Sequence, residues 1–352
     1  MEKPRYKAVY LYLTHSCDSN CSFCYRRGLF ERNDVKTLGP MFMSEQTAFN
    51  IIDFVFDSLD IQEDFTFFFW GGEPLLNFKV IKTVVEKYPQ FNFHTNTNGK
   101  PITEEMYKWF LKHRNITLTW SLGNTYEKYS GLPEKFEKEK WCFKTIKELP
   151  NNNVNYICTK YDSLDEDVQY IAKNLTENIG VDIATKFEHK DSDLEIFAKK
   201  YVDMLENLKY NRRLYESLKP ALFSNLYSRS KEKTDFHFCR TGLDRLFFDT
   251  QGGIWQCDNF YVCQSNQLGT INTGVDYSKL ELMQEVNDNQ EKYLGKYCEE
   301  CELYKQCPRN KCLGLNLEWM GDMFKPEPSY CKMCKVLFKI AKKYLEINKE
   351  QK

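Results

Sequence analysis

The chain lacks any long apolar run and carries almost no net charge. No apolar stretch approaches the ~20 residues that cross a bilayer, and the first residues, Met1-Glu2-Lys3-Pro4-Arg5, lack the apolar core of a signal peptide. The 49 Lys and Arg residues nearly balance the 50 Asp and Glu residues, giving a formal charge of −1, so no overall attraction to nucleic acid is expected. We therefore expect a cytoplasmic protein without a membrane or nucleic-acid partner.

Cysteine, by contrast, is abundant and unevenly distributed. The 352 residues include 14 cysteines and are 42% hydrophobic, which is enough for one or two folded domains. Without a secretory signal, so many thiols indicate metal ligation rather than disulfides. Three lie before residue 25 and nine between Cys239 and Cys334, whereas Cys142 and Cys158 stand apart and are interpreted as ordinary core or surface thiols.

Strand-like and helix-like segments alternate over residues 7–187 and predict about six β/α units. One of the helices is expected to begin with a capping box, Ser163-x-x-Glu166. This order predicts an α/β fold with a parallel sheet or a partial (β/α)6 barrel, whose reactive site lies at the C-terminal ends of the strands. The expected strands are Tyr6–Leu13, Asp64–Trp70, Phe91–Thr97, Ile116–Ser121, Val154–Thr159 and Val181–Phe187.

The first expected strand is followed by three cysteines at the spacing Cys17-x3-Cys21-x2-Cys24. A tetrahedral zinc site usually takes four ligands from two Cys-x2-Cys pairs, whereas a cubane cluster held by three thiolates keeps one iron open. The loop offers only three thiols, because the next cysteine is Cys142. It therefore indicates a cluster with one open iron. A zinc site completed from elsewhere, or buried apolar cysteines, are the alternatives.

This cysteine spacing, with aromatic Phe23 before the third cysteine, resembles the signature of the radical S-adenosylmethionine (SAM) enzymes. The resemblance implies that the open iron of a 4Fe–4S cluster binds SAM and that the reduced cluster cleaves it to a 5′-deoxyadenosyl radical. Gly71-Gly72-Glu73, after the second expected strand, resembles the family's Gly-Gly-Glu loop. The resemblance assigns binding of the SAM amino group to these three residues.

Two further loops at strand ends resemble the same family. Asn98 lies in a Thr-Asn-Gly turn like that of the family, which implies a cofactor contact; a plain Asn-Gly turn is the alternative. Ser121 begins Ser-Leu-Gly-Asn, where relatives usually show Ser-(Ile/Leu)-Asp-Gly and then an arginine that meets the SAM carboxylate. No arginine occurs between Arg114 and Arg212. Ser121 remains a candidate SAM contact, and Lys128 could meet the carboxylate.

The cysteines of the second half allow two interpretations. Two Cys-x2-Cys pairs, at 298–301 and 331–334, could form one four-thiolate zinc site. The whole series instead resembles the SPASM domain of radical SAM maturases, which holds two auxiliary 4Fe–4S clusters, although the run from 307 to 312 has one residue more than the family's pattern. The resemblance gives the first cluster Cys239, Cys257 and Cys312, with Cys263 or the substrate as fourth ligand. It gives the second cluster Cys298, Cys301, Cys307 and Cys331, and leaves Cys334 spare or a substitute for Cys331.

Asp258 directly follows Cys257, which looks like the arrangement in sulfatase maturases, where an Asp at this place deprotonates the substrate residue. After a hydrogen atom leaves a Cys or Ser side chain, loss of a proton produces a radical that readily gives up an electron. A carboxylate can take that proton. A surface Asp in a turn is the alternative.

Together the two resemblances imply a radical SAM maturase that modifies a peptide or protein side chain by formylglycine-type oxidation, a thioether or a carbon–carbon crosslink. A low-potential electron donor such as flavodoxin or ferredoxin is implied as partner. The alternatives are a small-molecule substrate, or a zinc-binding interaction protein without catalysis. The expected divisions are a barrel at 1–187, a helical bridge at 188–235, a SPASM domain at 236–335 and a C-terminal helix at 336–352.

Overall fold

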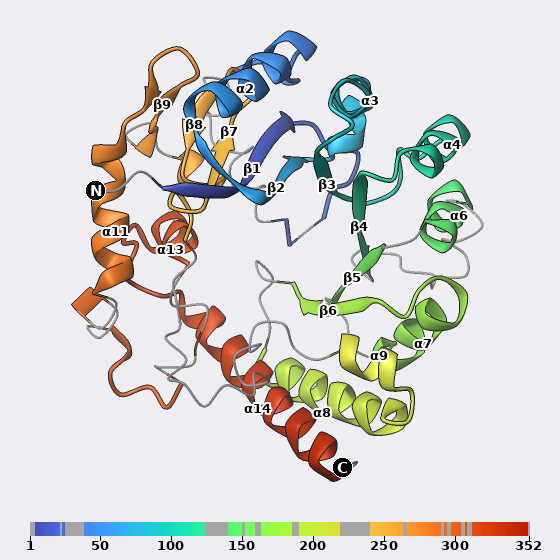
Figure 1. Ribbon diagram of the computed structural model, residues 1–352. Helices are drawn as coiled ribbons and strands as arrows, with labels where there is room; N and C mark the ends of the chain where they lie inside the picture. Colours follow the sequence, from blue (N-terminus) through green and yellow to red (C-terminus); the bar gives the residue numbers. More distant parts are fainter. Residues whose placement is uncertain are drawn as a thin grey trace.

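The computed structural model folds into one curved sheet with helices packed around its outer face (Figure 1). Among its described residues the sheet has ten strands, in the order β10-β9-β8-β7-β1-β2-β3-β4-β5-β6. No helix among those residues is long and apolar enough to cross a membrane. The described residues are 4–21, 23–24, 39–123, 140–149, 152–158, 163–184, 190–218, 240–262, 266–289, 292–293, 297–303, 307 and 312–350.

Six parallel strands form the first part of the sheet, each paired with the next in chain order. This confirms the predicted α/β fold, and the C-terminal ends of all six strands meet at one edge. The strands are β1 (Arg5–Thr14), β2 (Asp60–Gly71), β3 (Asn92–Thr97), β4 (Ile116–Gly123), β5 (Asn153–Cys158) and β6 (Ile179–Ile183).

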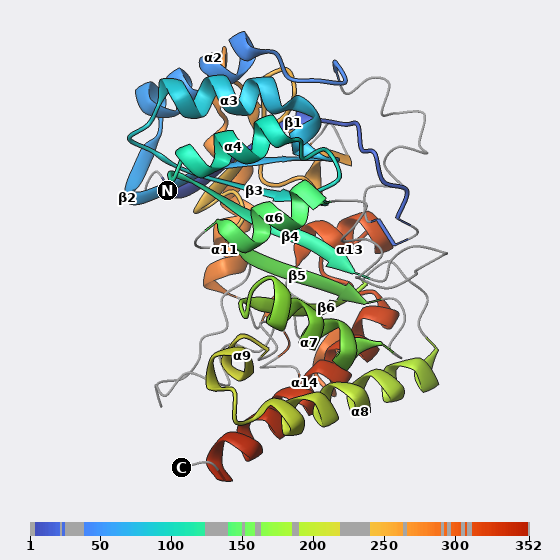
Figure 2. The ribbon, with the colours of Figure 1, turned by 90° about the vertical axis from the view of Figure 1, so that its right-hand side faces the viewer.

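Helices cover the outer face between these strands (Figure 2). Ser44 and Thr103 cap two of them, accepting hydrogen bonds from the backbone N–H groups of Thr47 and Met106. They are α2 (Glu45–Ser58), the short η2 (Pro74–Asn77), α3 (Phe78–Lys87), α4 (Glu104–Lys112), α6 (Lys140–Glu148) and α7 (Leu164–Asn174). The expected extensions of helix and strand into residues 136–139, 159 and 185–187 lie outside the described residues.

The capping box predicted at the start of α7 does not form. Ser163 precedes the helix, but its side chain makes no capping hydrogen bond. Its hydroxyl instead lies 2.9 Å from the carboxylate of Asp167, to which Tyr156 also donates a hydrogen bond. The buried carboxylate of Asp167 thus binds the hydroxyl that the prediction assigned to the backbone.

The cysteine-rich region extends the same sheet. Strand β7 (Arg245–Phe248) pairs in parallel with β1. A short antiparallel series of β8 (Gly253–Trp255), β9 (Gly269–Thr270) and β10 (Gly274–Val275) follows. Strand β1 is therefore shared: it lies between the (β/α) series and the later strands.

The last helices return the chain to the far end of the sheet. Helix α14 (Pro328–Glu350) lies along α8 (Asp191–Leu208) in both ribbon views (Figures 1 and 2). It begins eight residues before the expected position 336, because Glu327 accepts the backbone N–H groups of Ser329 and Tyr330 at its first turn. The remaining elements are α9 (Arg212–Ser217), η4 (Phe260–Val262), η6 (Tyr277–Leu280), α11 (Glu281–Asp288) and α13 (Leu313–Met320).

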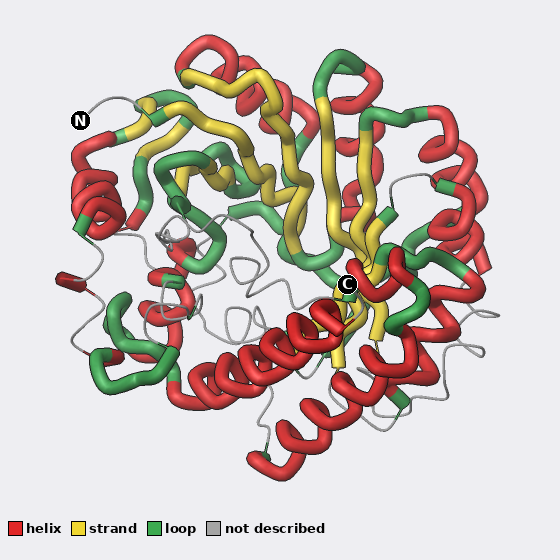
Figure 3. The backbone as a smooth tube through the Cα atoms, turned by 60° about the horizontal axis from the view of Figure 1, so that its bottom comes forward, coloured by secondary structure: helices red, strands yellow, loops and turns green. Residues whose placement is uncertain are grey.

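The hydrophobic core is divided between the two faces of the sheet. Figure 3 shows the strands of this sheet in yellow, with red helices along their outer side. The larger cluster includes Leu11 and Leu13 of β1 together with the helix residues that pack on that face. Alternate residues of a strand point to opposite faces, and Tyr12 accordingly belongs to a second cluster. That cluster consists of Tyr12, Phe247, Trp255 and Tyr261, with partly buried Tyr10 and Trp70 against it.

Candidate active site

The three-cysteine loop leaves the end of β1 through a tight turn. The side chain of Thr14 accepts a hydrogen bond from Ser16 N (2.9 Å) and donates one to Met41 O (3.0 Å), which fixes the start of the loop. Cys17 is exposed, and Cys21 and Cys24 are half-buried. Partial burial raises the pKa of the Cys17 thiol to about 11, and nearby negative charge, including that of Cys24, acts in the same direction. The described part of this loop thus carries three thiols whose soft sulfur donors suit an iron–sulfur cluster.

The two glycines after β2 lie directly against this loop. Gly72 N donates to Thr14 O and Glu73 N donates to Ser16 O, both at 2.9 Å. A Cβ atom on Gly71 would lie 2.5 Å from Thr14 O, and one on Gly72 would lie 2.3 Å from Ser16 O. Only glycine therefore allows the two backbones to approach this closely.

Glu73 is a buried carboxylate that joins the ends of β2 and β3. Its side chain accepts hydrogen bonds from Leu75 N (3.0 Å), Thr97 Oγ1 (2.8 Å) and Asn98 N (2.7 Å). Burial raises its pKa to about 7, against the effect of these three donors. The carboxylate oxygens are thus engaged inside the protein, and the predicted role of Gly71, Gly72 and Glu73 toward SAM stays a prediction.

Asn98 turns its side chain toward the cysteine loop. Its amide nitrogen donates to Asp18 Oδ1 (2.7 Å) and Ser19 Oγ (3.0 Å) and lies 4.0 Å from Cys17 Sγ. The next residue, Gly99, has a φ of +81° and packs on buried Cys142, with 2.3 Å from the position of a Cβ atom to the sulfur.

The other two predicted SAM contacts stay predictions. Ser121 is half-buried, and it follows Trp120, whose backbone pairs with Thr97 in the sheet. Phe23 is also half-buried, directly before Cys24. Lys128, the suggested carboxylate partner, lies outside the described residues.

Asp258 reaches the same edge of the sheet from the later strands. Asp249 shapes the β7–β8 hairpin by accepting hydrogen bonds from Gly253 N (2.9 Å) and Trp255 Nε1 (2.8 Å). The chain then passes through Cys257 to Asp258, whose Oδ2 accepts a hydrogen bond from Trp70 Nε1 at 3.1 Å. Trp70 was not among the residues predicted from the sequence. The sequence feature that could have identified Trp70 is its position at the end of a strand, directly before Gly71 and Gly72.

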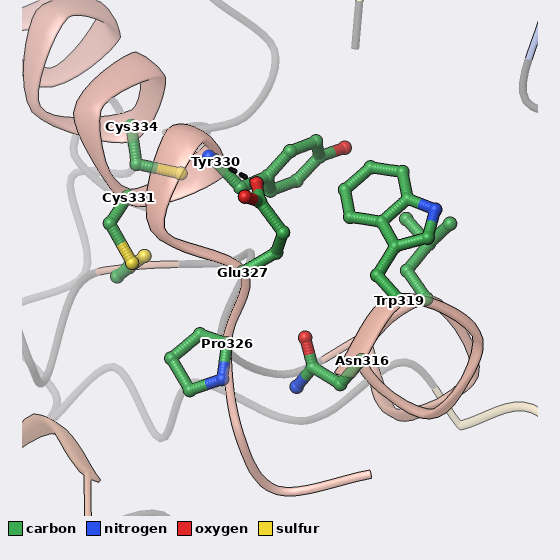
Figure 4. Close-up of a pocket in the computed structure, with 9 residues that line it drawn as sticks. Asn316, Trp319, Pro326, Glu327, Tyr330, Cys331 and Cys334 are labelled. Atoms are coloured by element: carbon green, nitrogen blue, oxygen red, sulfur yellow. Dashed lines mark hydrogen bonds between the residues drawn. The ribbon is translucent and has the colours of Figure 1, made fainter. Parts of the chain in front are cut away.

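The thiols expected to bind the second auxiliary cluster converge at the start of α14. Burial raises the pKa of Cys331 to about 11, and the negative charges of the nearby thiols of Cys307, Cys298 and Cys301 act in the same direction. In Figure 4 the side chains of Cys331 and Cys334 lie at one side of a cavity that Cys307 also lines. Cys334 is buried and lines the same cavity as Cys307 and Cys331.

Two thiols expected at the first auxiliary cluster lie on neighbouring segments. Cys312 precedes α13, and Cys257 precedes η4. A Cβ atom on Gly314 would lie 2.7 Å from Asn259 Cβ, so the start of α13 packs tightly against the segment after Cys257. Cys239 and Cys263 fall outside the described residues. Within the described ranges, no three His, Cys, Asp or Glu side chains are already arranged to hold a single metal ion.

Sequence comparison finds a radical SAM enzyme among the relatives of this chain. The chain is 22% identical over 360 residues to the radical SAM cyclopropyl synthase TigE of Paramaledivibacter caminithermalis, a match that covers 95% of this chain and 73% of that protein. It is 25% identical over 299 residues to an uncharacterized protein of Methanocaldococcus jannaschii, covering 78% of this chain and 91% of that protein. No protein-family model matches the chain.

Solved structures share the fold over nearly the whole chain. The structure of native anSMEcpe with bound AdoMet superimposes with a TM-score of 0.68 at 17% identity, covering 98% of this chain and 100% of that one. Streptococcus suis SuiB bound to the precursor peptide SuiA gives a TM-score of 0.62 at 16% identity, covering 93% and 76%. In sequence the chain is therefore similar to a radical SAM enzyme, which confirms the resemblance found in its cysteine motifs, and it shares its fold with a protein solved with bound AdoMet.

Proposed function

We propose that the protein is a radical SAM enzyme that oxidatively modifies a side chain of a peptide or protein. The observation that carries this proposal is the hydrogen bond from Trp70 to Asp258. It holds a carboxylate at the end of β2, one residue from the glycines that pack on the three-cysteine loop. The carboxylate of Asp258, a proton acceptor, and the three-cysteine loop, the expected radical source, thus both contact the end of β2.

Different residues of the chain have different roles in the proposed reaction. Cys17, Cys21 and Cys24 would hold the SAM-binding cluster, and the later cysteines, with Cys334 spare, would provide the ligands of two auxiliary clusters. When bound, SAM and its reduced cluster would supply a radical that removes one hydrogen atom from the substrate, and an auxiliary cluster would accept one electron. Asp258 takes the proton that the oxidised side chain loses. The indole N–H of Trp70 orients this carboxylate through its hydrogen bond to Oδ2.

The peptide substrate is supported by the solved relatives rather than by a pocket. SuiB was solved with its precursor peptide SuiA, and anSMEcpe with the Cp18Cys peptide. A cysteine or serine side chain would give a formylglycine-type product in this scheme. Similarity to a cyclopropyl synthase favours a carbon–carbon bond as the second candidate, since ring closure also removes two hydrogens. Either reaction requires a low-potential donor, such as flavodoxin or ferredoxin, to reduce the SAM-binding cluster.

The first experiment uses protein purified and reconstituted without oxygen. Iron and sulfide are counted, and 5′-deoxyadenosine is measured after SAM and dithionite are added. Three cubane clusters correspond to roughly 12 iron atoms per chain. We expect that value, and loss of 5′-deoxyadenosine when Cys17, Cys21 and Cys24 are replaced by Ala. Iron near four would remove the auxiliary clusters from the proposal, and bound zinc without SAM cleavage would overturn it.

A further inference from the structure

We propose that Asn98 is a positioning residue of the cysteine loop: its side-chain amide holds the segment Cys17–Ser19 and so sets the environment of the Cys17 sulfur. The sequence had suggested a SAM contact for Asn98. The proposal rests on the proposed function insofar as Cys17 is a cluster ligand. The contacts themselves join protein atoms only.

Both donor bonds of the Asn98 amide go to this loop. Its nitrogen donates to Asp18 Oδ1 at 2.7 Å and to Ser19 Oγ at 3.0 Å. Its oxygen accepts from Lys100 N at 2.9 Å, which fixes the side-chain rotamer. Both donor bonds cross between loops about 80 positions apart in sequence (separations of 80 and 79). The loop after β3 therefore contacts the loop after β1 through one side chain.

Asn98 is itself held on rigid structure. Its backbone N–H donates to the buried Glu73 carboxylate at 2.7 Å. Gly99 behind it has a left-handed φ of +81° and no room for a side chain. Lys100 adds a weaker contact of its own, from Nζ to Asp18 O at 3.4 Å. We call the hydrogen bonds from Asn98 to Asp18 and Ser19 the clamp. Because Asn98 is anchored at the ends of β2 and β3, the clamp restricts the movement of the cysteine loop.

The clamp has a consequence for the sulfur of Cys17. Ser19 N donates to Cys17 Sγ at 3.4 Å, and Asn98 Nδ2 lies 4.0 Å from the same sulfur. Hydrogen bonds to cluster sulfurs are one of the factors that set a cluster's reduction potential. Donors near a thiolate stabilise the more negative, reduced state. Loss of the clamp should therefore lower the reduction potential. Dithionite would then reduce a smaller share of the cluster, and less SAM would be cleaved.

The test compares Asn98→Ala and Asn98→Asp with Asn96→Ala in the reconstituted holoenzyme. Asn98→Asp keeps the shape and the acceptor for Lys100 N, but it places a carboxylate against Asp18. Asn96 is the matched control: it is the same residue type two positions earlier, and its side chain bonds His94 at 3.0 Å instead of the cysteine loop.

Three readouts separate the possible outcomes. The first needs no cluster: in the metal-free protein, Asn98→Ala should speed amide hydrogen exchange of residues 15–21, and Asn96→Ala should not. The second is the midpoint potential of the electron paramagnetic resonance signal that responds to SAM, which should fall in both Asn98 variants. The third is 5′-deoxyadenosine formation with dithionite, which should fall about 10- to 100-fold.

Unchanged exchange in Asn98→Ala would overturn the clamp, and changed exchange with an unchanged potential would overturn the effect on Cys17. These results differ from failure of the proposed function, in which the wild-type protein itself takes up no cluster or cleaves no SAM. In that case the exchange experiment still decides whether Asn98 holds the loop.

Discussion

Trp70 and Asp258 are 188 positions apart in sequence, and their side chains meet in a hydrogen bond of 3.1 Å at the end of β2. One belongs to the parallel (β/α) series and the other to the cysteine-rich region. The bond thus joins the two parts at the place where the sequence motifs predicted radical chemistry.

Replacement of Trp70 by Phe keeps an aromatic ring and removes the donor to Asp258. A hydrogen bond to a charged group contributes about 1.5–3 kcal/mol, so substrate turnover should fall about 10-fold or more while 5′-deoxyadenosine formation continues. The measurement is the ratio of modified peptide to 5′-deoxyadenosine, with a peptide that the wild-type enzyme modifies. Trp109→Phe is the control, because it removes an indole donor to Glu86 on the outer helices (2.7 Å). Equal ratios in both variants would contradict a role for Trp70.

Replacement of Asp258 by Asn removes the proposed proton acceptor without changing its shape. General bases contribute about 10²- to 10⁴-fold, and product formation should fall by that amount. Cleavage of SAM should persist, because the three-cysteine loop is untouched. Peptide mass spectrometry beside 5′-deoxyadenosine assays provides the measurement, and product formation near the wild-type rate would exclude Asp258 as the base.

Glu73 makes the stability of the metal-free protein depend on pH. Burial raises its pKa from 4.5 to about 7, so ionisation costs more free energy in the folded than in the unfolded state. Its favourable contribution is therefore full below pH 4.5 and is lost as the pH rises to about 7, a change of about 3 kcal/mol. In Glu73→Gln the dependence should disappear. Thermal unfolding from pH 4.5 to 8 tests this, and parallel curves for the two proteins would contradict it.

Gly72 should not tolerate even a methyl group. Its φ is not in the left-handed region, so the cost of Gly72→Ala comes from the 2.3 Å approach of the new Cβ to Ser16 O. The cysteine loop must then move away, and we expect about 1–3 kcal/mol of destabilisation with loss of cluster uptake. Gly180→Ala in β6, where the nearest atom is 3.5 Å away, is the matched control. Iron content and thermal unfolding distinguish the two variants.

Cys331 and Cys334 should differ as ligands although both line one cavity. The SPASM pattern uses Cys331, so Cys331→Ala should lose one cluster, roughly four of 12 iron atoms. Cys334→Ala should keep all of them. Iron analysis of the two variants provides the comparison, and the reverse result would assign Cys334 as the ligand.

The sequence indicated the parallel strands well, because their buried apolar runs are bounded by clear breaks. It also located the glycine pair correctly, since a close backbone approach has few solutions other than glycine. It could not reveal the hydrogen bond between Trp70 and Asp258, nor that the side chain of Asn98 points toward the cysteine loop. Both depend on segments that come together only after the sheet has formed. The capping box at Ser163 was wrong for a related reason: a buried Asp167, one turn along the helix, binds the hydroxyl instead.

The position of β1 between β2 and β7 also has a consequence for the time course of folding. The residues of β7 that pair with β1 are more than 200 positions away: Ala8 pairs with Arg245, and Leu11 with Phe248. Contacts at such separation form late, since a long loop must close first. During synthesis, the edge of β1 that binds β7 therefore stays unpaired until the β7–β8 hairpin has been made and has folded. Before that point the strand that carries the three-cysteine loop is incompletely supported, which favours insertion of the cluster after the whole sheet has formed.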